Sequence, residues 1–229
     1  MKLNKEVNMG FSKEWEQCYK ENKHISIWPW TDLISYVMRY IKPLGPNSKV
    51  LELGCGAGAN IPFFKYLGVS YYAVEGSKTI VKMLHEKFPE FKDTIKVGDF
   101  TKEIPFEEQF DLIVDRASIT SNTTSAIKNT ISLIFQKLKP GEKFIGIDWF
   151  STIHSDYKIG KICEDLNTKE KIEKGPLVGI GPVHFSDKEH LLELFSKFKI
   201  VIMEHKIYKR EIPSDDYTFA VWDFIACKE

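Results

Sequence analysis

VLELGCGAGAN, residues 50–60, is the stretch of sequence that decides the fold. It begins as an apolar, strand-like run, and a helix-like segment follows it. Three alternating glycines lie between the two, and they let a ligand come close to the backbone. Free N–H groups at the start of the following helix can bind polar groups of that ligand. The stretch therefore predicts a ligand-binding loop between a strand and a helix.

Outside this stretch, strand and helix patterns alternate along the chain. Strands are predicted at 49–53, 69–75, 94–99, 110–116 and 143–150, and helices at 59–67, 77–88 (capped by Ser77) and 123–138, the last ended by the turn 138–141. The continuous Val, Ile and Leu runs are typical of parallel strands that helices cover on both faces. Two long strand patterns, 199–211 and 217–228, indicate a hairpin whose last strand is an antiparallel edge. The prediction is an α/β fold with a doubly wound, seven-stranded, mostly parallel sheet.

The flanking segments suggest how one domain, residues 1–229, is organised. Residues 1–45 are predicted to hold helices at 11–22 and 31–41, the second capped by Thr31, and to form a lid. Residues 46–150 form the ligand-binding half, and 151–185 interrupt the alternation as a cap insertion. A helix opened by Ser186 and Glu189 as a capping box, followed by the hairpin, completes residues 186–229.

Composition narrows the classes of function. The 229 residues include 32 Lys and Arg and 32 Asp and Glu, so the net charge is zero. This balance argues against nucleic-acid or anionic-membrane partners. The four cysteines, widely spaced without a C-x-x-C pair, argue against a metal site and favour a reducing compartment. With no signal-like apolar run near the N-terminus, we expect a cytoplasmic protein.

Glu52, two residues before the first glycine, distinguishes two kinds of ligand. A carboxylate at this place would repel a pyrophosphate and favour a cationic ligand. Gly54, Gly56 and Ala59 nevertheless also fit the dinucleotide-binding fingerprint. An NAD(P)-dependent oxidoreductase is therefore an alternative.

An acidic residue followed by three alternating glycines after a strand resembles the first motif of class I S-adenosylmethionine-dependent methyltransferases. In that family, a carboxylate in the place of Glu75 binds the ribose hydroxyls, and one in the place of Asp99 binds the adenine amino group. Alone, Glu75 could be a solvated strand end and Asp99 a turn residue, but their order and spacing favour the ligand roles. The resemblance implies S-adenosylmethionine as cofactor, with contacts from Glu52, Gly54, Cys55, Gly56, Gly58, Asn60, Glu75, Gly76, Ser77, Asp99, Phe100, Asp115 and Arg116.

The residues that would act on the acceptor are less constrained, because the family has no universal base. Asp148 lies at the end of an apolar strand, and His154 and His184 flank the irregular segment 151–185, so these three are the catalytic candidates. Arg116 is expected to bind an anionic group or to pair with Asp115 or Asp99. Trp28, Trp30 and Trp149 could line an apolar pocket.

The resemblance implies methyl transfer to a small-molecule acceptor by in-line attack. Hydroxyl, carboxyl, amine and thiol acceptors remain open, and residues 115–118 weakly resemble enzymes acting on sugars and other hydrophilic molecules. A non-catalytic, cofactor-binding regulatory module is a further alternative, and the sequence does not define an oligomeric state.

Overall fold

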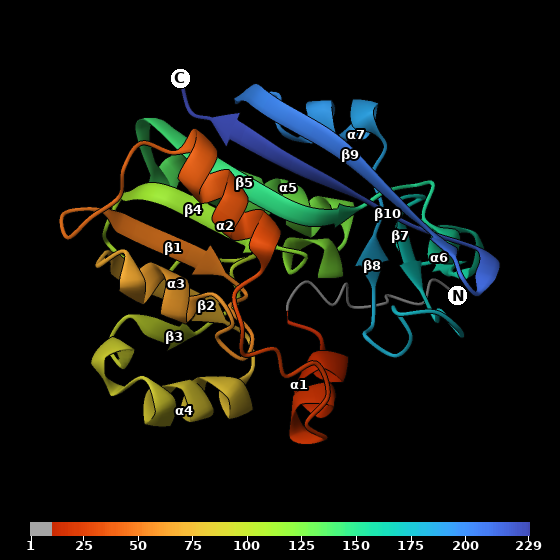
Figure 1. Ribbon diagram of the computed structural model, residues 1–229, viewed down its shortest axis with the longest axis horizontal. Coiled ribbons are helices and arrows are strands. Elements are labelled where there is room, and N and C mark those ends of the chain that lie inside the picture. The colour runs from red at the N-terminus through yellow and green to blue at the C-terminus, as the bar shows by residue number, and fades with distance from the viewer. Residues whose placement is uncertain (1–10) are drawn as a thin grey trace, which may run out of the picture.

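The computed structural model describes residues 11–229, in which a seven-stranded sheet forms the centre of the molecule (Figure 1). The expectation about a signal segment therefore falls partly on residues outside the described ones. The strand order is β3-β2-β1-β4-β5-β10-β9. These strands are β1 (Lys49–Leu53), β2 (Ser70–Glu75), β3 (Ile95–Val97), β4 (Phe110–Arg116), β5 (Leu138–Phe150), β9 (Lys199–Glu211) and β10 (Ser214–Cys227). The doubly wound, mostly parallel sheet is confirmed.

The last strand lies in a different place from the one expected. β10 is antiparallel, as predicted, but it lies between β5 and β9, so β9 is the edge strand. Burial explains this order, because residues 220–226 of β10 are all buried, whereas most of β9 is exposed or partly exposed. A strand rich in charged residues suits an edge, since charges discourage pairing with other chains.

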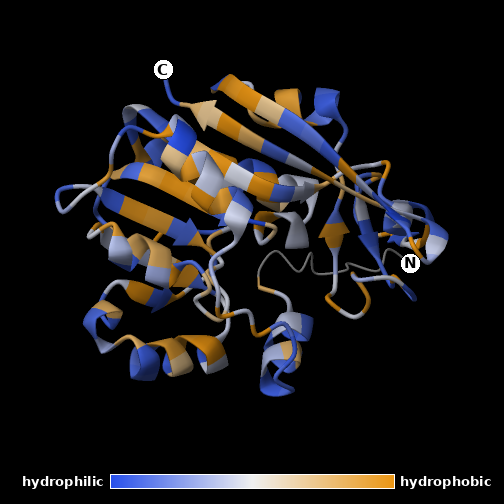
Figure 2. Ribbon diagram, in the orientation of Figure 1, coloured by the Kyte–Doolittle hydropathy of each residue, from blue (hydrophilic) through white to orange (hydrophobic). Residues whose placement is uncertain are grey.

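Helices cover both faces of the sheet. Buried residues of α2, α3 and α4 pack on one face, and those of α5 and α7 pack on the other. Apolar residues follow the central strands and the helix faces turned toward them (Figure 2). The helices are α1 (Lys13–Lys20), α2 (Thr31–Tyr40), α3 (Ile61–Tyr66), α4 (Lys78–Lys87), α5 (Thr124–Lys137), α6 (Ser155–Ile159) and α7 (Lys188–Leu194), with 3-10 turns η1 (Pro89–Phe91) and η2 (Ile119–Ser121).

Two predicted helix caps are wrong. The residue before α2 is Trp30, and Thr31 is the first helical residue. Asp187, not Ser186, caps α7 and accepts a hydrogen bond from the His190 N–H at 2.8 Å. The backbone of Ser186 instead extends the sheet region, where its N–H donates to the Phe150 carbonyl.

The turn predicted at 138–141 lies inside β5. The pairing of β4 with β5 begins at Phe110 and Leu138 and shifts in register before Leu112. Gly141 takes up the irregularity with a φ of 78°. The predicted turn residues therefore lie within the irregular start of β5 and not before the strand.

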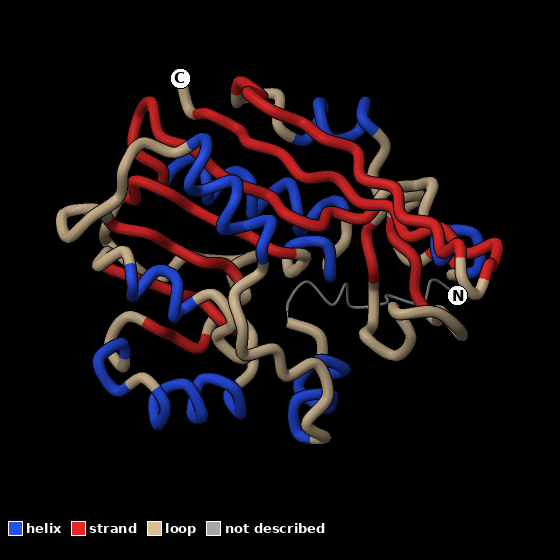
Figure 3. Tube along the Cα trace, in the orientation of Figure 1, coloured by secondary structure: helices blue, strands red, loops and turns tan. Residues whose placement is uncertain are grey.

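Residues 151–185 form a small structure of their own beside the main sheet (Figure 3). It contains α6 and a three-stranded antiparallel sheet of β6 (Lys161–Ile162), β7 (Thr168–Glu170) and β8 (Val183–His184). A third apolar cluster joins this segment to the main sheet through Phe150 and Val221, and Trp15 of α1 packs against the same cluster. No helix among residues 11–229 is long and apolar enough to span a membrane.

Candidate active site

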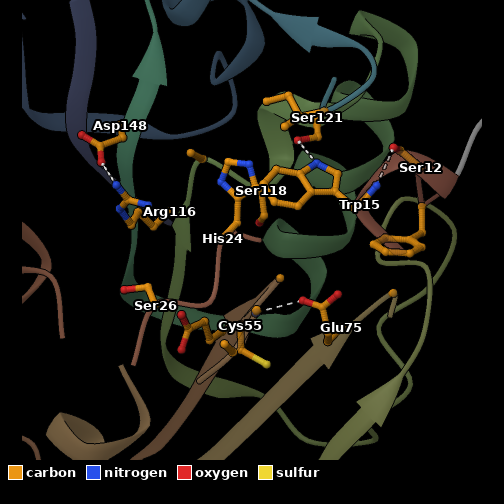
Figure 4. Close-up of a pocket in the computed structure, with 18 of the residues that line it drawn as sticks. Ser12, Trp15, His24, Ser26, Cys55, Glu75, Arg116, Ser118, Ser121 and Asp148 are labelled. Atoms are coloured by element: carbon orange, nitrogen blue, oxygen red, sulfur yellow. Dashed lines mark hydrogen bonds and ion pairs between the residues drawn. The ribbon is translucent and has the colours of Figure 1, made fainter. Parts of the chain in front are cut away.

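A cavity of about 630 Å³ opens at the carboxyl ends of β1, β2, β4 and β5 (Figure 4). Open α/β sheets bind ligands at this edge, and the volume lies within the range of roughly 300–1,000 Å³ usual for small-molecule sites. The N-terminal segment supplies one wall, and residues 176–180 of the small structure supply another.

The three glycines of the loop after β1 have different surroundings. Gly54 and Gly56 line the cavity with φ values of 67° and 49°, a conformation that other residues rarely adopt. Gly58 does not line the cavity. It faces α4 instead, where a Cβ would lie 2.6 Å from a methyl carbon of Leu84. Gly58 therefore lets the loop pack closely on α4. Gly54 lets it pack on Ser118, whose Cβ would lie 2.3 Å from a Cβ at Gly54. Gly56, where a Cβ would meet only the Tyr19 hydroxyl at 3.2 Å, leaves backbone open to a ligand.

Glu52 is buried, and both of its carboxylate oxygens are hydrogen-bonded. The Asn60 amide donates to one oxygen at 2.8 Å, and the Tyr71 hydroxyl donates to the other at 2.6 Å. Burial raises the pKa of Glu52 to about 7, despite these two bonds. The Trp30 N–H in turn donates to the Asn60 carbonyl oxygen at 3.3 Å. Glu52 thus lines the cavity and also anchors the start of α2 through Asn60.

Glu75 reaches the same cavity from the end of β2. Its two oxygens accept backbone N–H groups of Gly56 and Ser77, each at 2.9 Å. Burial raises the pKa of Glu75. Each oxygen keeps a lone pair, so the carboxylate can still accept hydrogen bonds from a ligand.

The two residues that follow Glu75 differ in position. Gly76 lines the cavity, and a Cβ there would collide with the Phe11 ring at 2.1 Å. Ser77 is fully buried outside the cavity lining; its hydroxyl accepts the Ile80 N–H and donates to Glu16 of α1 at 2.5 Å. The structure therefore places Ser77 as the helix cap that the sequence also predicted.

Asp99 and Phe100 both line the cavity, next to the end of β3. One oxygen of Asp99 accepts the Thr101 N–H at 3.0 Å, and the other lies 3.0 Å from the Lys102 ammonium. Cys55 is a buried lining residue, and burial raises the pKa of its thiol well above its usual range. A protonated thiol is a poor nucleophile, so Cys55 acts here as a small lining side chain.

Asp115 lies behind the cavity wall and does not line it. Its carboxylate accepts the Ile119 N–H at 3.0 Å, the Trp149 indole N–H at 2.8 Å and bonds from Ser118. Burial raises its pKa to about 6. These bonds hold the end of β4 in place, so the structure gives Asp115 a supporting position.

Arg116, Asp148 and Trp30 come together at the other end of the cavity. Arg116 forms an ion pair with Asp148 at 2.7 Å, and not with Asp115 or Asp99 as expected. Its guanidinium carbon lies 3.4 Å from the centre of the Trp30 ring. Asp148 has a φ of 56°, and its N–H donates to the buried Asp223 carboxylate at 2.8 Å; Lys206 is bonded to the same carboxylate. The buried hydrogen bond to Asp223 thus fixes the backbone of Asp148, whose side chain pairs with Arg116.

His154 and His184 are fully buried and lie outside the cavity lining, contrary to the expectation that they face the reaction. His154 accepts the Asp156 N–H through Nδ1 at 3.1 Å and thereby caps α6. His184 contacts Thr168 and His190, and burial lowers its pKa to about 3. Both side chains lie in the interior of the small structure formed by residues 151–185 and not at its surface.

Several lining residues were not singled out from the sequence. Among the described residues, His24 is the one histidine of the cavity, and it lies there beside Ser26, Trp15 and Tyr19. Of the three tryptophans proposed as pocket walls, only Trp30 lines the cavity; Trp28 is 75% exposed and Trp149 is in the core. The signal for these residues was the aromatic N-terminal segment, which the sequence placed near the cavity without naming His24.

No group of three or more His, Cys, Asp and Glu side chains among residues 11–229 is arranged to hold a metal ion. The polar groups that line the cavity include carboxylates, which accept hydrogen bonds, and backbone N–H groups and one guanidinium, which donate them. These suit an organic ligand with hydroxyl, amine and carboxyl groups.

Comparisons with known proteins agree with this geometry. A family model described as a methyltransferase domain matches residues 50–141. No curated protein matches the chain. Among solved structures, an S-adenosylmethionine-dependent methyltransferase from Methanosarcina mazei has 18% identity and a TM-score of 0.66 over 88% of this chain and 98% of its own. Geranyl diphosphate C-methyltransferase from Streptomyces coelicolor has 12% identity and a TM-score of 0.62, over 87% and 76%.

A methyltransferase from Clostridium acetobutylicum is similar over 94% of this chain and 91% of its own, with 13% identity and a TM-score of 0.58. The structural similarity to these proteins covers nearly the whole chain and not only the matched residues 50–141. Residues 50–141 thus match a methyltransferase-domain model, and the fold of nearly the whole chain is similar to that of these methyltransferases.

Proposed function

We propose that the chain transfers a methyl group from S-adenosylmethionine to a small molecule that has an apolar body and one hydroxyl or amine. The observation that supports this most is the two-ended cavity. Carboxylates and the glycine loop line one end, and an ion pair with aromatic and aliphatic side chains lines the other.

The cofactor end fits S-adenosylmethionine. Gly56 leaves backbone free where the ligand must come close, and Glu75 has lone pairs left for the ribose hydroxyls. Asp99 and Phe100 follow in position for the adenine. The bound cofactor supplies an activated methyl group on a sulfonium whose leaving group is a neutral thioether. Glu52, when ionised, stabilises positive charge in this part of the cavity.

The acceptor end lies across β4 and β5, next to the glycine loop. Phe150, Phe219, Leu177 and Ile180 line it together with Trp30. Such a surface favours an aromatic or aliphatic acceptor over a sugar. The Arg116–Asp148 pair would face the acceptor and position it, and Arg116, expected among the cofactor ligands, would orient Asp148.

Two flanking segments would enclose the reaction. Residues 11–30 are proposed as a lid and residues 151–185 as the acceptor cap, because both contribute walls of the cavity. Excluding water from the reacting atoms strengthens the interactions that align them. Four unpaired cysteines support a reducing cytoplasmic location. The zero net charge supports a small-molecule acceptor over a nucleic acid.

The test is transfer of labelled methyl from S-adenosylmethionine to a panel of phenols, indoles, amines and sugars. Product from phenols, indoles or amines, and its loss in Asp99→Ala, would support the proposal. Calorimetry with S-adenosylmethionine and with NAD checks the alternatives. Binding of NAD alone would favour an oxidoreductase, and tight cofactor binding with no product from any acceptor would favour a regulatory module.

A further inference from the structure

Several residues that line the cavity have a strained backbone conformation with positive φ. The described non-glycine residues with positive φ are Asn22, His24, Ala117, Asp148 and Lys171, and three of them, His24, Ala117 and Asp148, line the cavity. Strain of this kind persists where the surrounding structure imposes it, often at functional sites. The three residues come from three separate segments, so the strain is a property of the site and not of one loop.

His24 is held in its strained position by local contacts. Its carbonyl accepts the Ser26 N–H at 3.1 Å, and the Trp15 ring packs edge-on against its imidazole with 5.2 Å between the ring centres. In Figure 4 the imidazole projects into the cavity, with Trp15 beside it and the Arg116–Asp148 pair across from it. The imidazole has no hydrogen-bond partner among residues 11–229.

The other titratable groups of the cavity are already engaged. Asp148 is paired with Arg116, and the carboxylates of Glu52, Glu75 and Asp99 accept bonds from neighbouring residues. Burial raises the pKa of both Tyr19 and Cys55. The groups whose charge can reach His24 are thus Arg116 and Asp148, the three other carboxylates, and Tyr19 and Cys55 in their protonated forms. Among these groups, the His24 imidazole is the one without such a partner, and an imidazole nitrogen can accept the proton of a hydroxyl or amine.

We propose that His24 is the general base of the methyl transfer and contacts the acceptor atom directly. This inference rests on the proposed function. As the bond between acceptor atom and methyl carbon forms, the sulfur keeps the electron pair of the bond that breaks. The proton of the acceptor hydroxyl or amine passes to the imidazole, and His24, which is exposed, then releases it to water.

The test compares His24→Asn and His24→Gln with the unaltered protein, using the phenol or amine of the panel that gives the highest turnover. Asn tolerates positive φ, so the first variant keeps the backbone. We expect kcat/KM to fall about 100-fold, as for loss of a general base. Calorimetric affinity for S-adenosylhomocysteine should stay the same.

Two further measurements keep the outcomes separate. His85→Gln is the matched control, since His85 lies outside the cavity lining and contacts the Ile95 carbonyl at 2.8 Å; it should keep full activity. The NMR signal of the His24 imidazole should shift when the acceptor binds. A His24→Asn variant that keeps the rate, or an unshifted signal, would overturn the role of His24 alone. Absence of labelled product from the unaltered protein would overturn the proposed function as well.

Discussion

The two ends of the cavity are built in different ways. At the cofactor end, each carboxylate is held by the loop that carries it or by an adjacent strand end: Glu75 accepts the Ser77 N–H two residues on, and Asp99 accepts that of Thr101. At the acceptor end, Trp30, Arg116 and Asp148 meet from three distant parts of the chain. The cofactor end thus rests on bonds within and between neighbouring strands and loops, whereas the acceptor end depends on the packing of distant segments.

The largest expected effect is at the cofactor end. Gly56→Val should lower the affinity for S-adenosylmethionine by at least about 100-fold, because the new side chain enters space that the ligand needs. A Cβ at this position meets only the Tyr19 hydroxyl, at 3.2 Å, so the fold should survive. Calorimetry with the cofactor measures the effect.

Gly68→Val is the control for backbone strain. Gly68 has a φ of 69°, but a Cβ there meets nothing within 4 Å. It should lose similar stability on thermal unfolding and keep its cofactor affinity. Equal losses of affinity in both variants would mean that strain, not filled space, removes the ligand.

Asp148→Asn should separate the two ends. Asn is similar in size and tolerates the φ of 56°, but it removes the ion pair with Arg116. We expect kcat/KM for the acceptor to fall about 30-fold, the value of a charged hydrogen bond of ~2 kcal/mol. Cofactor affinity should not change, and Asp215→Asn at the exposed hairpin tip should change neither. A parallel loss of cofactor affinity would contradict the division into two ends.

Glu52 gives the cofactor end a pH dependence. Because its pKa is about 7 without ligand, the ionised form that attracts a cation is populated above this pH. Affinity for S-adenosylmethionine should therefore rise as pH increases from about 6 to 8, and Glu52→Gln should lower it about tenfold at pH 8. S-adenosylhomocysteine, whose sulfur is neutral, should show a weaker pH dependence in the same titration.

The same substitution should stabilise the protein. The folded-state pKa of Glu52 lies above the ordinary value of 4.5, so stability is lost as pH rises from that value through 7. Glu52→Gln removes this loss, and its melting temperature should exceed that of the unaltered protein at pH 8 but not at pH 5. If the variant melts lower at both pH values, the hydrogen bonds to Asn60 and Tyr71 outweigh the buried charge.

The smallest expected effect concerns the cap. Leu177→Ala should raise KM for an apolar acceptor about fivefold, the value of ~1 kcal/mol of lost apolar contact. Cofactor affinity should stay unchanged, because Leu177 lies on the wall formed by residues 176–180. Leu166→Ala, at a side chain 69% exposed, is the control. Removing most of 160–180 would be a poorer test, since buried Ile172 and Ile180 belong to the third apolar cluster.

The sequence predicted the cofactor end better than the acceptor end for a physical reason. Alternating glycines, strand ends and an acid before the loop are local patterns, and the residues from Glu52 to Gly56 and from Glu75 to Gly76 line the cavity apart from Leu53. Asp115 was misplaced because the face of a strand end depends on which neighbours, here Trp149 and Ser118, compete for the carboxylate.

The acceptor end required tertiary information. His154 and His184 looked like loop histidines, but the structure buries both. Phe219 of β10 and Phe185 pack on His154, and Thr168 and His190 contact His184. The pairing of Arg116 with Asp148 depends on β4 and β5 being neighbours and on the reversed backbone at Asp148. The place of β10 inside the sheet followed only from the full burial of its residues 220–226.

The insertion of β10 between β5 and β9 also ties the Arg116–Asp148 pair to the C-terminal hairpin. Asp223 of β10 holds the Asp148 backbone, whereas the glycine loop and Glu75 lie in the first half of the chain. A change in the hairpin should therefore disturb the Arg116–Asp148 pair and leave the glycine loop intact.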